Sequence, residues 1–123
     1  AGAFITQGFD KCLMVMTDAY FQQVYDRINK MNLADPTARM LRRLILSNAY
    51  PVEADKVGRI LVPQNLRAFL GIENGELTVA GQGDYFEVWM PAEWKTQMDK
   101  LQDVEANEQR FSTLDLSNNF LSS

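Results

Sequence analysis

The 123-residue chain contains no histidine and only one cysteine, Cys12. Without histidine there can be no Ser-His-Asp site, no histidine general base and no histidine-ligated metal. A single cysteine excludes an internal disulfide and a cysteine-based zinc site. Because Cys12 lies beside Leu13 and Met14, we interpret it as a small buried hydrophobic residue rather than a reactive thiol.

Long apolar runs are missing too, and none approaches the roughly 20 residues of a membrane-spanning helix. The N-terminus lacks a basic region ahead of an apolar block, so we expect no signal peptide. The only glycine-rich candidate, residues 81–83, lacks the lysine and helix that a phosphate loop requires. These absences argue against an enzyme, a cofactor, a metal, a small-molecule substrate and a membrane partner, and they favour a cytoplasmic protein.

The composition favours a folded chain, since 46% of the residues are hydrophobic and 11% are aromatic. The net charge of −4 by itself disfavours nucleic-acid binding. The charge is unevenly distributed, however. Residues 36–70 hold six cations and two anions, a net of +4, and the rest holds six cations and fourteen anions, a net of −8. The six cations are Arg39, Arg42, Arg43, Lys56, Arg59 and Arg67. This asymmetry is compatible with one face that meets an anionic polymer.

The most informative segment, residues 55–67, reads Asp-Lys-Val-Gly-Arg-Ile-Leu-Val-Pro-Gln-Asn-Leu-Arg. We predict short strands at residues 50–54 and 59–62, joined by the charged turn. Gly58 would supply the positive φ of the turn, and Asp55 would cap it or orient Arg59. Two cations at the tip of a hairpin suit an anion.

Hydrophobic periodicity and capping residues predict the remaining elements. We expect hairpins at residues 3–7 with 11–16 and 76–81 with 85–90, and helices at 17–31, 36–47, 63–70 and 91–104. Thr17 and the Asp35-Pro36 pair would begin two of these helices, and Gly71 would end a third. From Glu105 onward we expect a flexible tail, or one that docks on a neighbouring subunit.

Two segments resemble each other at an offset of 74 residues, each reading as a hairpin followed by a helix. The matched pairs are Ile5 with Val79, Asp10 with Asp84, Met14 with Val88, Met16 with Met90, Tyr20 with Trp94, and Val24 with Met98. We interpret them as an internal duplication. The charged hairpin precedes only the second copy, so we expect an N-terminally shortened chain. Its parts would be a truncated first repeat with a helical insertion (1–48), a second repeat with a closing helix (49–104) and a tail (105–123).

The pattern Asp-x-x-Gly-Arg-(apolar)3-Pro at residues 55–63, followed by Leu-Thr-Val-Ala-Gly at 77–81 and Tyr-Phe-Glu-Val-Trp at 85–89, resembles the MraZ family. The Arg-rich helix before Ser47 adds to the likeness. The resemblance implies an α+β fold, an AbrB-like (SpoVT/AbrB) swapped-hairpin β-barrel with flanking helices and pseudo-two-fold repeats. It also implies a nucleoid-associated transcriptional regulator that forms homo-oligomeric rings on tandem boxes of double-stranded DNA upstream of the division and cell-wall gene cluster.

Carried onto this sequence, the resemblance implies that Lys56 and Arg59 contact DNA. Arg67 is a further candidate, for which a surface salt bridge is an equal alternative. Asp55 and Gly58 would shape the turn. The aromatic candidates for the subunit interface are Trp89, Trp94 and Tyr20. For the two tryptophans, packing in the core is the alternative.

Two other interpretations stay open. The arginines of residues 36–47 are more typical of a solvated helix face or a subunit contact than of a DNA site. The whole chain is alternatively a non-DNA-binding assembly fragment of such a regulator, joined through exposed strand edges.

Overall fold

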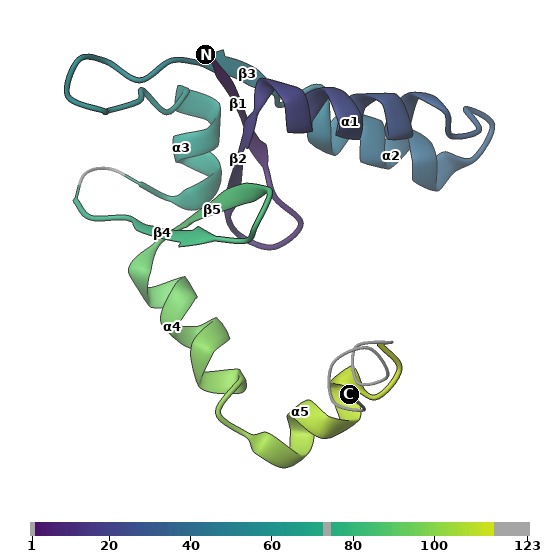
Figure 1. Cartoon of the computed structure of the whole chain (residues 1–123), viewed down its shortest axis with the longest axis vertical. Helices are drawn as coiled ribbons and strands as arrows, with labels where there is room; N and C mark the ends of the chain where they lie inside the picture. Colours follow the sequence, from purple (N-terminus) through teal and green to yellow (C-terminus); the bar gives the residue numbers. More distant parts are fainter. Residues whose placement is uncertain (1, 73–74, 115–123) are drawn as a thin grey trace. The chain divides into compact units, whose positions relative to one another are not determined.

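The structure, a computed structural model, describes residues 2–72 and 75–114. The chain divides into two units, Ala1–Pro91 and Ala92–Ser123. The first unit contains a five-stranded antiparallel sheet in the order β3-β1-β2-β5-β4 (Figure 1). The predicted α+β class is therefore confirmed. The elements of the first unit are β1 (Ala3–Gln7), β2 (Leu13–Thr17), α1 (Asp18–Asn29), α2 (Pro36–Ile45), β3 (Tyr50–Val52), α3 (Gln64–Leu70), β4 (Thr78–Gly81) and β5 (Tyr85–Trp89).

Helix boundaries follow the local signals in the sequence. The Thr17 hydroxyl accepts a hydrogen bond from the Tyr20 N–H at 3.1 Å and so caps α1. The Asp35 carboxylate does the same for α2, with Pro36 in the first turn. Gly71 ends α3 in the left-handed conformation, with φ 82°. These three predictions are confirmed.

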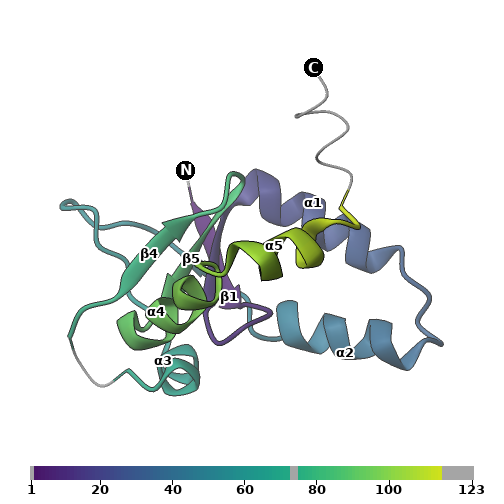
Figure 2. The ribbon, with the colours of Figure 1, turned by 90° about the horizontal axis from the view of Figure 1, so that it is seen from below.

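The two faces of the sheet are covered by different helices (Figures 1 and 2). Helix α3 packs on one face and completes the core there, made of Ile5, Leu13, Val52, Leu66, Leu70 and Val88. On the other face the α1–α2 pair is joined to β1, since the buried Thr6 hydroxyl donates to the Ile45 carbonyl at 2.7 Å. The Phe4 and Phe21 rings also stack, with centroids 4.1 Å apart.

The hairpins β1–β2 and β4–β5 pair with each other through β2 and β5, with Leu13 opposite Val88. Opposite residues share a face, so Met14, the neighbour of Leu13, lies on the face opposite to Val88. The predicted match of Met14 with Val88 thus joins two residues on opposite faces of the sheet, and the internal duplication stays a prediction. The turn that Gln82 closes onto Tyr85 is one residue shorter than the turn that Gly8 closes onto Cys12. If the second hairpin is aligned on the first with this shorter turn, Val88 corresponds to Val15 and Val79 to Ile5. Each of these pairs of equivalent residues then lies on the same face of the sheet.

The predicted strand at residues 59–62 does not form in the structure, and β3 ends at Val52 rather than at residue 54. One backbone hydrogen bond, from the Asp55 N–H to the Arg59 carbonyl at 2.7 Å, is all that remains of the expected ladder there. β3 is an edge strand of the sheet, paired with β1, and none of the described strands pairs with its outer edge. Leu61 is consequently 79% exposed.

The second unit also differs from the expectation. The predicted helix at 91–104 is instead α4 (Pro91–Lys100) followed by α5 (Val104–Phe111). The Asp103 carboxylate accepts from the Ala106 N–H at 3.1 Å and begins the new helix. Residues 105–111, expected to belong to a flexible tail, are thus helical. Residues 115–123 of that tail lie outside the described residues.

Candidate nucleic-acid interface

The Asp55 carboxylate organises the charged turn between β3 and α3. Its Oδ1 atom accepts hydrogen bonds from the backbone N–H of Val57 at 3.0 Å and of Arg59 at 2.9 Å. The Gly58 N–H donates to the Asp55 carbonyl at 3.0 Å, and Gly58 has φ 83°. Only glycine adopts this φ without strain, so a tight turn at this point requires it. The sequence Asp-x-x-Gly-Arg therefore encodes the local geometry.

The same carboxylate orients the Arg59 side chain. Arg59 Nε donates to Asp55 Oδ2 at 2.9 Å, while the Arg59 side chain stays 78% exposed. Within the described chain, the two terminal nitrogens of the guanidinium make no hydrogen bond, so its outer edge is available to an acceptor. Hydrogen bonds from the Arg59 backbone, and then those from Val57 and the Arg59 side chain, hold the pKa of Asp55 below its usual range.

Lys56 occupies the tip of the turn beside this pair. Its side chain is exposed and makes no ion pair with any residue that the structure describes. The loop that carries Lys56 and Arg59 projects from the sheet between β3 and α3 (Figure 1). Two cations are thus presented by a hydrogen-bonded turn, and the Asp55 carboxylate is occupied in holding it.

Arg67 is placed differently. It is exposed on α3, immediately after the buried Leu66. In residues 2–72 and 75–114, no hydrogen bond or ion pair joins Arg67 to the turn. The structure brings Lys56 and Arg59 together, and leaves Arg67 as a separate cation on the neighbouring helix.

The arginines of α2 are mostly engaged within the fold. Arg39 donates to the Leu33 carbonyl at 2.8 Å, and Arg42 donates to the Asn29 side chain at 3.0 Å. Arg42 therefore ties α2 to the end of α1, a role that the sequence analysis did not foresee. Arg43 remains exposed.

The aromatic candidates for the subunit interface are unequally accessible. Trp89 is only 3% exposed, which favours the core role among its two alternatives. Tyr20 is half-buried, stacked on Tyr85 with centroids 6.0 Å apart, and Trp94 is half-buried in the second unit. No contact with another subunit is established for any of them.

Glu87 on β5 is a half-buried partner that the sequence analysis missed. It accepts hydrogen bonds from the Trp89 indole at 3.1 Å and from the Cys12 thiol at 3.8 Å. Burial, followed by the nearby Glu87 charge, raises the pKa of Cys12 to about 12. The interpretation of Cys12 as a buried residue is confirmed, and its lack of reactivity stays a prediction. Only pairing of β2 with β5 brings the two residues together, so no local signal could have revealed the contact.

Among the helices that the structure describes, none combines the length and the apolar character needed to cross a membrane. The described residues also contain no group of three or more histidine, cysteine, aspartate or glutamate side chains arranged to hold a metal ion.

Comparison with known proteins places these features in a family. The family described as "MraZ protein, putative antitoxin-like" matches residues 45–116, which include the charged turn, the second hairpin, α4 and α5. A protein of Nitrosospira multiformis named transcriptional regulator MraZ is 40% identical over 95 residues, covering 77% of this chain and 64% of the relative. A protein of the same name from Thermomicrobium roseum is 37% identical over 97 residues, covering 79% of this chain and 68% of the relative.

A third protein of that name, from a Roseiflexus species, is 35% identical over 94 residues, covering 76% of this chain and 65% of the relative. The chain thus spans about two thirds of the length of these curated relatives, and slightly less for the first and third. The relatives are named as regulators rather than as enzymes. On the match to the family and the identity to these relatives, the chain belongs to the MraZ family.

Proposed function

We propose that this chain is the DNA-binding core of a transcriptional regulator, and that the turn at residues 55–59 contacts duplex DNA. The observation that carries the proposal is the Asp55–Arg59 pair, which fixes the turn and leaves the outer edge of the guanidinium exposed. The names of the relatives support a regulatory role. The +4 charge of residues 36–70 supports an anionic partner despite the acidic total.

Two kinds of DNA contact suit the turn. Lys56 is a flexible point charge that pairs with a phosphate. Arg59 presents a planar fork that matches either a phosphate or the O6 and N7 acceptors of guanine in the major groove. Asp55 repels phosphate and so serves the fold of the turn rather than the DNA contact. Arg67 would add a phosphate contact from α3.

A single turn with two cations binds DNA weakly, so several turns must act together. We therefore propose that chains of this kind assemble into a ring through AbrB-like swapped-hairpin repeats and bind tandem boxes, where avidity multiplies weak contacts. The hairpin-helix order of β1-β2-α1 and β4-β5-α4 supports the internal duplication. Control of the division and cell-wall gene cluster, and a place at the nucleoid, belong to the same proposal.

The test is fluorescence anisotropy on duplex DNA that carries tandem boxes, measured over a salt series. We expect affinity to fall steeply with salt and Arg59→Ala to weaken binding at least tenfold. Lys95→Ala is the matched control, because Lys95 and Asp99 form an exposed i,i+4 pair with the same 2.9 Å distance. An equal loss of DNA affinity in both variants, or no loss in Arg59→Ala, would count against the site.

A second candidate function is supported by the exposed apolar residues beside the turn. Val57 is 71% exposed and Leu61 is 79% exposed, as expected for a segment that lacks a partner strand. The chain could then act as a non-DNA-binding assembly module, with residues 59–62 paired to another copy. Light scattering together with the anisotropy series separates the two functions. Assembly without DNA binding at low salt would favour the module.

A further inference from the structure

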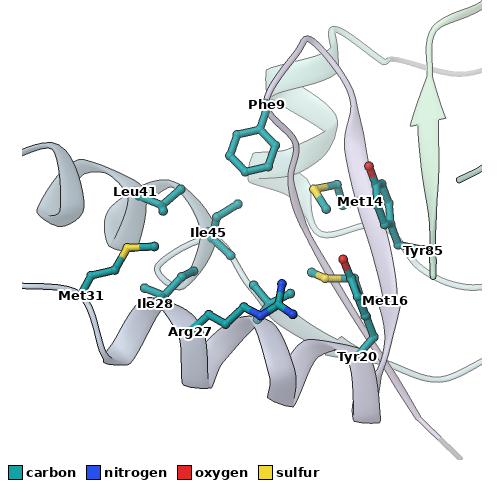
Figure 3. Close-up of a pocket in the computed structure, with 11 residues that line it drawn as sticks. Phe9, Met14, Met16, Tyr20, Arg27, Ile28, Met31, Leu41, Ile45 and Tyr85 are labelled. Carbon is teal, nitrogen blue, oxygen red and sulfur yellow. The ribbon is translucent and has the colours of Figure 1, made fainter. Parts of the chain in front are cut away.

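A cavity of about 250 Å³ lies between the α1–α2 pair and the sheet, entirely within the first unit (Figure 3). Strand β2 contributes Met14 and Met16, and the two helices contribute Ile28, Leu41 and Ile45. Methionine side chains are flexible and polarisable, and they adapt to ligands of irregular shape. The cavity is smaller than the roughly 300–1,000 Å³ typical of sites for drug-sized ligands, which favours a short, slender occupant.

Arg27 is the charged residue among those that line the cavity. It extends from the last turn of α1 toward the other lining side chains (Figure 3). Unlike Arg39 and Arg42, it makes no hydrogen bond or ion pair with any residue in the described ranges. A guanidinium is a fork of donors that matches a carboxylate. An unpaired one beside an apolar cavity therefore complements a ligand with an apolar chain and one anionic end.

Two tyrosines add polar atoms to the same wall. Tyr20 and Tyr85 line the cavity with their rings stacked. Burial, then the charge of Glu87, raises the pKa of Tyr85, so its hydroxyl stays protonated at neutral pH and can donate a hydrogen bond. The site thus combines an apolar interior with a few polar donors among its lining residues, the pattern of small-ligand sites.

We propose that this cavity binds a short straight-chain carboxylate, with its alkyl chain among the methionines and its carboxylate on Arg27. The alkyl chain leaves water for an apolar wall, and the carboxylate pairs with Arg27, an exposed cation that lines the cavity and makes no ion pair within the described ranges. The inference uses residues of the first unit alone and does not depend on the DNA-binding proposal.

Isothermal titration calorimetry of the full chain with hexanoate, octanoate and decanoate tests the site. We expect saturable binding that tightens by about fourfold per added CH₂ group until the cavity is full. Octanol and octyltrimethylammonium provide the comparison. Octanol should bind more weakly than octanoate, and the cation should not bind. Equal binding of the cation and the carboxylate would overturn the proposal.

Variants separate the charge from the cavity. Arg27→Met should remove the preference for octanoate over octanol, while octanol still binds. Arg43→Met is the control for the loss of one exposed cation, and it should bind octanoate as the wild type does. Val24→Phe should fill the cavity and abolish binding of both ligands, with circular dichroism showing an intact fold. An undiminished preference for octanoate in Arg27→Met would contradict the assignment.

Two further outcomes would overturn the proposal. One is the absence of saturable octanoate binding to the wild type at any protein concentration. The other is binding that appears only when the protein is diluted to monomers, because the cavity would then be covered by a second copy of the chain.

Discussion

The turn at residues 55–59 and helix α2 both carry arginines, yet they use them in opposite ways. In α2, Arg42 donates to Asn29 and helps to hold two helices together. In the turn, Arg59 shares only its Nε with Asp55 and presents the rest of its guanidinium to solvent. The number of arginines in a segment therefore does not identify an interface. What distinguishes the two regions is how many donors the fold already satisfies.

The largest effect on stability should come from the attachment of α2 to the sheet. Thr6→Val removes the buried hydroxyl that donates to the Ile45 carbonyl at 2.7 Å and leaves that acceptor unsatisfied. We expect a loss of about 1–3 kcal/mol in the free energy of unfolding, measured by urea denaturation. DNA affinity below the unfolding transition should not change. A parallel loss of affinity would show that the two regions are coupled.

A smaller effect is expected at Arg42. Arg42→Met keeps the aliphatic stem but removes the hydrogen bonds to Asn29, which should lower the free energy of unfolding by about 1 kcal/mol. Among the described residues, Arg42 Nε is a buried atom without a hydrogen-bond partner. Its removal should therefore offset part of the loss in unfolding free energy. Chemical denaturation measures the change. Reduced DNA affinity in this variant, with stability intact, would erase the contrast between the two regions.

Gly58→Ala tests the turn itself. A Cβ at Gly58 would meet no atom within 4 Å, so the cost comes only from φ 83°. Strain of about 1 kcal/mol should shift the turn and weaken DNA binding several-fold, with little change in the melting temperature of the protein. Anisotropy and thermal denaturation on the same sample measure both. Unchanged affinity would mean that the shape of the turn is unimportant for binding.

The smallest effect concerns pH. Because folding lowers the pKa of Asp55 below its ordinary value of 3.8, its contribution to the turn is fully present above about pH 4 and is lost as the pH falls through the lower, folded value. NMR signals of the Arg59 Nε–H should therefore stay constant from pH 7 to pH 5 and shift only at more acidic pH. An Asp55→Asn variant should lack this transition. A transition near neutral pH would contradict the assignment.

Local chemistry made part of this molecule predictable. The caps at Thr17 and Asp35, the stop at Gly71 and the geometry around Gly58 depend on neighbours within a few residues, so the sequence reveals them. The Asp55–Arg59 pair also lies within one turn, which is why the candidate site could be located. Its role in DNA contact stays a prediction.

Features that depend on distant partners could not be read in the same way. Glu87 meets Cys12 across 75 positions of sequence, and Arg42 meets Asn29 across a helix connection. The strand expected at residues 59–62 does not form on the outer edge of β3, and local propensity does not decide whether a segment pairs with an edge strand. The one-residue difference between the two hairpin turns places the matched residues Met14 and Val88 on opposite faces, because strand side chains alternate with a period of two.

The most direct test of the central claim is the salt dependence of DNA affinity for the wild type, Arg59→Ala and Arg42→Met. We predict that Arg59→Ala lowers the affinity for DNA. If Arg59 contacts a phosphate, the slope of log K against log salt should also fall by about one phosphate contact for each bound chain. If it contacts guanine, the slope should stay unchanged and the preference for guanine should relax. Arg42→Met should keep the affinity, slope and preference of the wild type. Identical behaviour of all three proteins would contradict the claim that the exposed guanidinium of the turn meets DNA.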